Sequence, residues 1–402
     1  MQPEKGGRAD QTRNPYTPGA GKPPPALVGR ESELAAGRTV VDRTAQGRSA
    51  TAPIFYGLRG VGKTVLLKAL HTQADAAGWL TVEIEGKQEA SEQQHTRRRL
   101  ARGLVSAARR TVGRSTALTD TWRRALGTIS SFSAAAGATG VEVSLGVDPS
   151  RGRGDTGDAE MDLEELVHDM VPALQESRTG LGIFVDEIQD LAPSALSALI
   201  SVQHRAGQNG WPFHLYGAGL PNVPARLADV RSSAERFHFV QIGALSAADA
   251  RAAFADPAAE EGVTYEPAAL DRLVAASGGY PYFVQVFGDQ AWRLAPGPDE
   301  IVLSDAAVAI AEATSVLDDS LFHSRWNRAT PAQKTLMRAM AEDSGRSQIA
   351  DLVTRLGKRK PSDLSVSRDG LIKKGLIYAP DRGLLQFTVP HMDDYIRRQH
   401  ES

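Results

Sequence analysis

The feature that most constrains this chain is an apolar segment, TAPIFYG at residues 51–57, which leads directly into a glycine-rich turn and then a helical pattern. The turn from Gly57 to Thr64 reads GLRGVGKT and fits the pattern G-x-x-x-x-G-K-[ST]. Glycines let successive backbone N–H groups converge on phosphate oxygens, and the positive end of the following helix dipole adds to that attraction. The spacing therefore predicts a buried strand, a phosphate-binding loop and a helix in direct succession.

The residue types in this loop suit a nucleoside triphosphate. We expect the Lys63 ammonium to reach the β and γ phosphates and the Thr64 hydroxyl to bind Mg²⁺. A chance glycine-rich turn is the alternative, but such a turn rarely has both a strand before it and a helix after it. The predicted nucleotide contacts of the loop are Gly57, Arg59, Gly60, Val61, Gly62, Lys63, Thr64 and Val65.

A second motif supplies the acids that this chemistry needs. The apolar run in GLGIFVDEIQDL ends in Asp186 and Glu187. We expect Asp186 to hold the magnesium shell and Glu187 to polarise the water that attacks the γ-phosphate. Acids at a strand end are often only a solvated turn, but here a phosphate-binding loop lies upstream. The Asp-Glu pair favours water as the nucleophile over the hydroxyl of a small-molecule substrate.

Short apolar segments alternate with amphipathic helical segments over the first part of the chain. Besides residues 51–57, strands are predicted at 79–86, 180–186, 211–219 and 237–243. Strands this apolar, separated by helices, are typical of a parallel sheet that is covered on both faces. We therefore expect an α/β fold.

Composition divides the chain into four parts. Residues 1–25 are rich in Pro, Gly and charge and are expected to form a disordered leader. Residues 26–245 carry the α/β pattern, 246–324 predict helices only, and 325–402 read as a separate C-terminal unit. The glycine-rich stretch from 127 to 160 predicts a hairpin followed by a flexible insertion.

The overall composition excludes several classes of protein. The 402 residues are 41% hydrophobic and 23% charged, which is typical of a soluble globular protein with two or three domains. The absence of cysteine excludes a disulfide-stapled scaffold and cysteine-ligated zinc or iron–sulfur sites. The sequence has no run of about 18 apolar residues and no secretory signal pattern, so we expect a cytoplasmic protein without a membrane partner.

The C-terminal unit combines a basic excess with a recognisable order of elements. From Leu321 to Ser402 there are 15 Lys and Arg against 9 Asp and Glu. Three short helices precede two strands joined at residues 380–383, an order that resembles a winged helix. Its expected recognition helix runs from about Pro361 to Lys374 and suits the major groove of double-stranded DNA, while the alternative is a packing or protein-binding module. The cations on or beside this helix and in the wing are Lys358, Arg359, Lys360, Arg368, Lys373, Lys374 and Arg382.

Together these motifs resemble the AAA+ and STAND-like P-loop ATPases, especially the archaeal-type ATPases and the initiator ATPases related to origin-recognition proteins. The resemblance implies a P-loop NTPase sheet, a helical lid and a C-terminal winged helix, with ATP and Mg²⁺ bound. It also implies that Val28, Gly29 and Arg30 line the adenine pocket, whereas an ordinary loop before a helix is the other interpretation. The segment GGYP resembles the G-x-P motif of STAND-type lids and would bring Pro281 to the nucleotide, although Pro is also common in the first turn of a helix.

The resemblance has one further implication and two departures. Arg236, or less favourably Arg231, occupies the stretch where AAA+ proteins place an arginine finger, but an ordinary surface arginine is the alternative. The fourth strand ends in YGAG without the usual sensor-1 side chain, and the lid helix after Pro281 shows no convincing sensor-2 arginine. Asn222 is a weak substitute that could equally cap the next helix. These two departures argue against fast hydrolysis.

The leading hypothesis is an ATPase that hydrolyses MgATP and couples its nucleotide state to movement of the C-terminal winged helix on DNA. The alternative is a slow nucleotide-gated switch or scaffold that recognises a protein partner. A helper of transposition or plasmid maintenance would carry the same signature. The sequence leaves open whether the protein forms a homo-oligomer.

Overall fold

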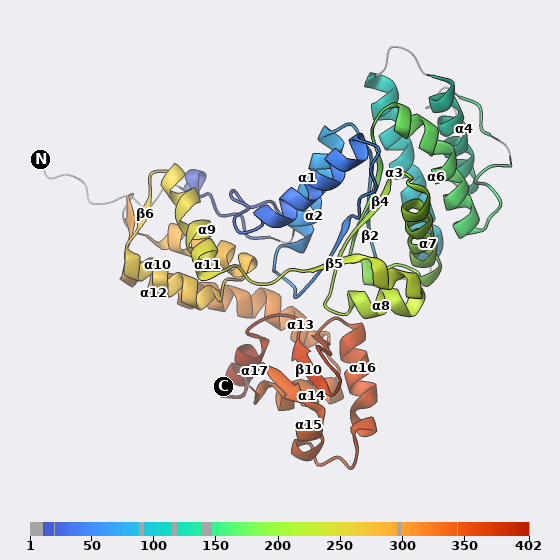
Figure 1. Cartoon of the computed structure of the whole chain (residues 1–402). Helices are drawn as coiled ribbons and strands as arrows, with labels where there is room; N and C mark the ends of the chain where they lie inside the picture. Colours follow the sequence, from blue (N-terminus) through green and yellow to red (C-terminus); the bar gives the residue numbers. More distant parts are fainter. Residues whose placement is uncertain are drawn as a thin grey trace, which may run out of the picture.

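The computed structural model describes residues 11–19, 21–87, 92–114, 119–137, 147–150, 152–295, 299–343 and 345–401. Its centre is a five-stranded sheet in the order β2-β3-β4-β1-β5, in which every pair of neighbouring strands is parallel (Figure 1). The α/β fold expected from the sequence is confirmed. The strands are β1 (Pro53–Tyr56), β2 (Leu80–Glu85), β3 (Leu181–Asp186), β4 (Phe213–Gly219) and β5 (His238–Gln241).

Helices cover both faces of this sheet (Figure 1). Side chains alternate along each strand, so that Ile183 packs into the core on one face while Phe184 packs into the core on the other. The Phe184 ring stacks on Tyr216 of β4 with 4.4 Å between ring centroids. One face carries α1 (Glu31–Ala45) and α2 (Lys63–Ala76), and the other carries α3 (Glu92–Arg114), α4 (Asp120–Ala135), α6 (Ala159–Glu176), α7 (Pro193–Asn209) and α8 (Val223–Val230).

The stretch from 127 to 160 differs from the expected hairpin and flexible insertion. Residues 127–135 belong to α4, and Thr128, Ser130 and Ser133 are buried there. Small side chains allow α4 to pack closely against α3 and α6, which is why a composition typical of a loop forms a helix. Arg153 lies in the segment between α4 and α6 and forms an ion pair with Asp169 on α6. This ion pair holds the described part of that segment against α6. Residues 138–146 and 151 lie outside the described residues.

A helical part follows the sheet. It consists of α9 (Ala247–Glu260), α10 (Pro267–Ser277), α11 (Pro281–Leu294) and α12 (Leu303–Leu317). The expectation of helices only is wrong in one detail, because β6 (Thr264–Tyr265) and β7 (Glu300–Ile301) form a small parallel pair. Strands of two residues carry no sequence periodicity. A π-helical turn, η4 (Asp318–Phe322), and α13 (His323–Asn327) lead to the C-terminal part.

The C-terminal part surrounds a three-stranded antiparallel sheet of order β8-β10-β9. The first strand, β8, was not expected from the sequence, because it has three residues and two of them are exposed. Thr330 and Gln333 form a capping box at the start of α14, which explains why this helix begins after Thr330. The elements are α14 (Pro331–Ala341), β8 (Arg346–Gln348), α15 (Ile349–Arg355), the 3-10 turn η5 (Pro361–Leu364), α16 (Ser365–Lys373), β9 (Ile377–Tyr378), β10 (Leu384–Phe387) and α17 (Met392–Glu401).

The helical part and the C-terminal part share one hydrophobic core. Phe322 of η4 stacks on Tyr395 of α17 with 5.5 Å between ring centroids. Arg398 of α17 forms an ion pair with Asp318. These contacts join α17 to the turn after α12, so the two parts are packed as one body.

The N-terminal segment differs from the expected disordered leader over residues 11–19 and 21–25. Tyr16 is 3% exposed and packs in the core of the helical part. Its hydroxyl donates to the Phe254 carbonyl and lies 2.6 Å from the Tyr265 hydroxyl. Asn14 donates to Asp289 on α11. A single aromatic anchor in a polar segment is enough to dock it, and an average over composition does not reveal such an anchor.

Replacing Tyr16 with Ala tests this docking. The variant should lose about 3 to 5 kcal/mol of unfolding free energy, because a large buried side chain leaves a cavity and two polar groups lose their partner. Urea unfolding measures the loss. Pro23→Ala, at an exposed position of the same segment, should stay within about 0.5 kcal/mol of the parent. Equal stability of Tyr16→Ala and the parent would contradict the docking.

Candidate functional site

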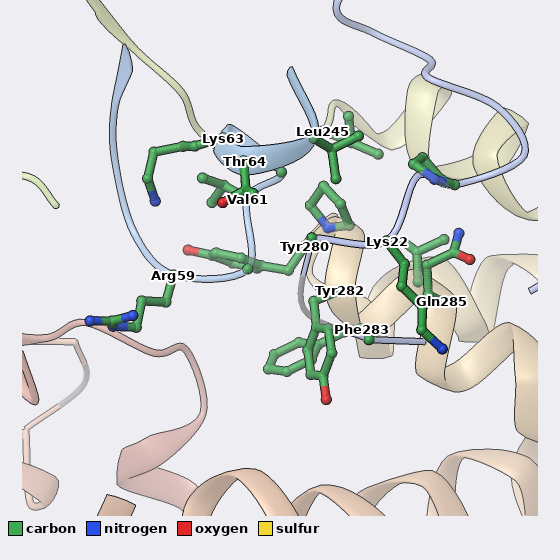
Figure 2. Close-up of a pocket in the computed structure, with 18 of the residues that line it drawn as sticks. Lys22, Arg59, Val61, Lys63, Thr64, Leu245, Tyr280, Tyr282, Phe283 and Gln285 are labelled. Atoms are coloured by element: carbon green, nitrogen blue, oxygen red, sulfur yellow. The ribbon is translucent and has the colours of Figure 1, made fainter. Parts of the chain in front are cut away.

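A cavity of about 320 Å³ lies where the loop after β1 meets four other segments. Residues 59–65 form one wall, and Asp186 and Glu187 follow β3. The first turn of α11 forms the wall opposite the loop (Figure 2). The N-terminal segment also contributes to the wall, as do Arg325 of α13 and Val389 of the C-terminal part. All parts of the chain thus converge on one cavity.

The loop conformation depends on two glycines. Gly60 has φ of 83° and Gly62 has φ of 91°, in the left-handed region that L side chains rarely adopt. Gly62 directly precedes α2, so the free N–H groups at the start of this helix face the loop. Lys63 Nζ donates to the carbonyls of Gly57 and Leu58 at 3.0 and 2.7 Å. Burial lowers the pKa of Lys63 to about 8.

Thr64 and Asp186 connect the loop to the acidic strand end. The Thr64 hydroxyl donates to Asp186 Oδ2 at 2.8 Å. Both β1 and β3 pair with β4 in parallel, so their carboxyl ends reach the same edge of the sheet. Burial raises the pKa of Asp186, while the bond from Thr64 opposes that shift. A hydroxyl beside a carboxylate supplies the oxygen ligands that Mg²⁺ prefers.

Glu187 is held from two sides. Arg59 Nη1 lies 2.9 Å from Glu187 Oε1, and Gln189 Nε2 donates to Oε2 at 2.7 Å. The side-chain oxygen Oε1 of Gln189 in turn accepts a hydrogen bond from the N–H of Leu220, just after β4. Glu187 has φ of 47°, a strained value for a side-chain-bearing residue. Gln189 lies within the segment GLGIFVDEIQDL, but only the two acids of that segment were expected to act in the site.

The structure brings most of the sequence-predicted residues to this cavity. Gly57 does not line it, and its N–H donates to Gly219 at the end of β4. Gly29 also lies outside the wall and is packed against Asp249. The predicted residues in the wall are Val28, Arg30, Arg59, Gly60, Val61, Gly62, Lys63, Thr64, Val65, Asp186, Glu187 and Pro281.

Neither candidate arginine finger lines the cavity of its own chain. Arg236 is exposed at the end of the 3-10 turn η3 (Ser232–Arg236), outside the residues of the wall. Arg231 forms an ion pair with Glu160 on α6 and bonds to Ser197. Arg231 is therefore part of the packing between α6, α7 and η3.

Arg30 connects the glycine loop to the segment after β5. Its guanidinium donates to the carbonyls of Val61 and Gly243, at 3.3 and 2.5 Å, and thereby joins the loop to the segment after β5. Burial lowers the pKa of this guanidinium. Two backbone acceptors give Arg30 a structural role in shaping the cavity.

Several wall residues lay beyond the reach of sequence reasoning. Figure 2 shows Tyr282 and Phe283 of α11 across the cavity from Val61 and Thr64. The Tyr282 N–H donates to the Gly60 carbonyl, and the Arg59 N–H donates to the carbonyl of Thr388, which follows β10. No sequence motif marks Tyr282, Phe283 or Thr388. Further missed wall residues are Lys22, Leu245, Tyr280, Gln285 and Arg325.

Models of known protein families match two parts of the chain. Residues 26–215 match the AAA ATPase domain. The AAA ATPase match contains the loop and both acids that face the cavity. Residues 319–396 match a domain of unknown function (DUF8462). No curated protein matches the sequence.

One solved structure supports the fold, and others show a lower similarity. The Walker-type ATPase PABY2304 of Pyrococcus abyssi is 14% identical, with a TM-score of 0.60, over 92% of this chain and 96% of that one. The chain therefore has a P-loop NTPase fold. ORC1 of Aeropyrum pernix, solved in complex with DNA, is 17% identical over 94% of both chains, with a TM-score of 0.45. The RuvB Holliday junction branch migration motor of Thermotoga maritima is 15% identical over 93% of this chain and 97% of that one, with a TM-score of 0.43.

Among the described helices, none combines the length and the apolar character needed to cross a bilayer.

A double-mutant cycle tests the contact between Arg59 and Glu187. The variants Arg59→Met and Glu187→Gln, alone and together, should give a coupling of about 1 kcal/mol in unfolding free energy, since the pair is only half-buried. Urea unfolding without nucleotide measures it. Additive effects of the two substitutions would show that the pair does not form.

Proposed function

We propose that this protein binds ATP with Mg²⁺ and hydrolyses the γ-phosphate bond with water as the nucleophile. The observation that carries the proposal is the hydrogen bond between Thr64 and Asp186 beside a glycine loop at the start of a helix. This combination offers converging N–H groups, an ammonium and two oxygen ligands within one cavity. The match to the AAA ATPase domain over residues 26–215 supports the same activity.

Each wall residue has a role in this proposal. The N–H groups of residues 60–64 and the Lys63 ammonium hold the β and γ phosphates. Val28 and Leu245 give an apolar surface for the adenine. Thr64 and Asp186 would hold Mg²⁺, which, when bound, neutralises charge that develops on the phosphates.

Glu187 has the carboxylate that polarises water, but both of its oxygens are engaged. Arg59 and Gln189 must move, or share the carboxylate with water, before Glu187 can act. A triphosphate supplies a competing anion for Arg59 and thereby releases Glu187. We infer that the bound nucleotide frees the Glu187 carboxylate and so promotes its own hydrolysis.

Two substitutions separate binding from turnover. Lys63→Ala should abolish ATP binding, because the buried cation that balances the phosphates is lost. Glu187→Gln should keep ATP affinity within about threefold and lower kcat about 100-fold or more. Isothermal titration and steady-state phosphate release measure the two properties.

Glu85→Gln is the matched control, since Glu85 is an exposed acid at the end of the neighbouring strand β2 and lies outside the cavity wall. It should behave as the parent in both assays. ATP binding by Lys63→Ala equal to that of the parent would refute the site.

We propose that nucleotide state moves the C-terminal part as a winged helix together with the lid. In this division, residues 26–245 form the ATPase core, 246–324 the lid and 325–402 the winged helix. The shared core of the last two supports joint movement, as do the Arg59 and Tyr282 contacts that connect both to the loop. Pro281 contributes to the wall at the start of the lid helix α11.

We propose double-stranded DNA as the partner of the winged helix. Lys358, Arg359 and Lys360 are exposed before α16, and Val366 on α16 is 86% exposed. Lys374 is a poorer candidate, because its ammonium donates to the Arg328 carbonyl and to Gln333 Oε1. The expected DNA contacts therefore shift toward residues 358–360.

The triple variant Lys358→Ala, Arg359→Ala, Lys360→Ala tests DNA contact. Its affinity for duplex DNA should fall, and the slope of log K against log salt should become about 2 to 3 units shallower, because each neutralised phosphate contributes about 0.9. Fluorescence anisotropy at several salt concentrations measures this. The control, Arg102→Ala, Arg109→Ala, Arg124→Ala, removes three exposed cations elsewhere and should keep the parental slope. Parental protein without salt-dependent binding would contradict the DNA proposal.

A slow nucleotide-gated switch with a protein partner is the second candidate. The doubly held Glu187 favours it, as does the end of β4, where YGAG carries no polar sensor side chain. Arg236 remains a hypothesis for a homo-oligomer, since an exposed arginine outside its own cavity acts in hydrolysis only on a neighbouring copy.

A further inference from the structure

One cation in the cavity wall has no role in the mechanism proposed above. Arg325 lies in α13, between the helical part and the C-terminal part, and faces the cavity that holds the glycine loop. Its Nε is buried and has no hydrogen-bond partner. Arg325 as a whole is only partly buried, but its Nε has lost water without gaining an acceptor, which is costly for a charged group.

The charged groups around Arg325 do not neutralise the positive charge of its guanidinium. Burial lowers the pKa of Arg325 to about 10, and repulsion by the charges of Arg59 and Arg328 adds to that shift. Glu187 attracts it, but Arg59 and Gln189 already occupy both oxygens of that carboxylate. The site therefore has an excess of positive charge at the point where Arg59, Arg325 and the loop meet.

Arg325 is also firmly connected to the C-terminal part. The next residue, Trp326, is 9% exposed, and the charged groups of Lys334 and Arg338 on α14 lie 5.0 and 5.3 Å from the centroid of its ring. Arg328 donates to the Lys374 carbonyl, and Lys374 donates back to the Arg328 carbonyl. A displacement of Arg325 is therefore transmitted to α14 and to the end of α16.

We propose that Arg325 binds the terminal phosphate of the bound nucleoside triphosphate and is the residue through which that phosphate positions the C-terminal part. This inference rests on the proposed ATP site and assigns one of its contacts. A guanidinium forms paired, charge-assisted hydrogen bonds with phosphate oxygens, which would satisfy its buried Nε and the surplus charge together. A nucleoside diphosphate lacks the group that Arg325 contacts.

The test compares triphosphate with diphosphate affinity. Calorimetric titration with ADP and with a non-hydrolysable ATP analogue, each with Mg²⁺, is applied to the parent, Arg325→Ala and Arg325→Lys. Arg325→Ala should weaken the triphosphate analogue about tenfold or more and ADP less than about threefold. Arg325→Lys should recover part of the triphosphate affinity, since it keeps the charge but loses the planar fork. Arg328→Ala, an exposed cation on the same stretch, should leave both affinities within about threefold.

Thermal unfolding without nucleotide separates this role from a structural one. An unpaired cation destabilises the empty site, so Arg325→Ala should unfold at the same temperature as the parent or a higher one. Equal losses for ADP and the triphosphate, unchanged affinity for both, or a lower unfolding temperature would each overturn the inference while the ATP site stands. A parent that binds neither nucleotide would overturn the proposed function and this inference with it.

Discussion

The arrangement of the whole cavity depends on the bond between Thr64 and Asp186. These residues are 122 positions apart, and they meet only because β1 and β3 flank β4 in a parallel sheet. The same topology brings the loop, the acids and the start of α2 to one edge. Once this edge is formed, the helical and C-terminal parts complete the cavity by packing against it. The bond therefore links the topology of the sheet to the chemistry proposed for it.

The elements that the sequence predicted well share one property, which is that their signal is local. The strand, loop and helix around Gly62 follow from side-chain periodicity and from a backbone that only glycine adopts readily. The apolar run before Asp186 identifies a buried strand in the same way. The placement of these two segments on one edge then follows from the rules for parallel sheets. This is why the five strands and the main wall residues could be predicted together.

The residues that escaped prediction depend on contacts between distant segments. Tyr16 is one aromatic residue in a polar stretch, and its burial is decided by a site on α9 and β6 that no local pattern describes. Gln189 and Arg325 are likewise defined by what they face. Lys374 is the converse case, a residue for which the sequence suggested a role that its contacts do not favour. Its position on the expected recognition helix suggested DNA contact, but its ammonium donates hydrogen bonds within the protein. Charge on a helix does not show which way each side chain points.

The most direct test of the account is a crystal structure with a non-hydrolysable ATP analogue and Mn²⁺ in place of Mg²⁺, in which anomalous scattering locates the metal. We expect the metal beside the Thr64 hydroxyl and Asp186, with the γ-phosphate between Lys63 and Glu187. A triphosphate bound elsewhere, or a metal remote from both Thr64 and Asp186, would contradict the central claim.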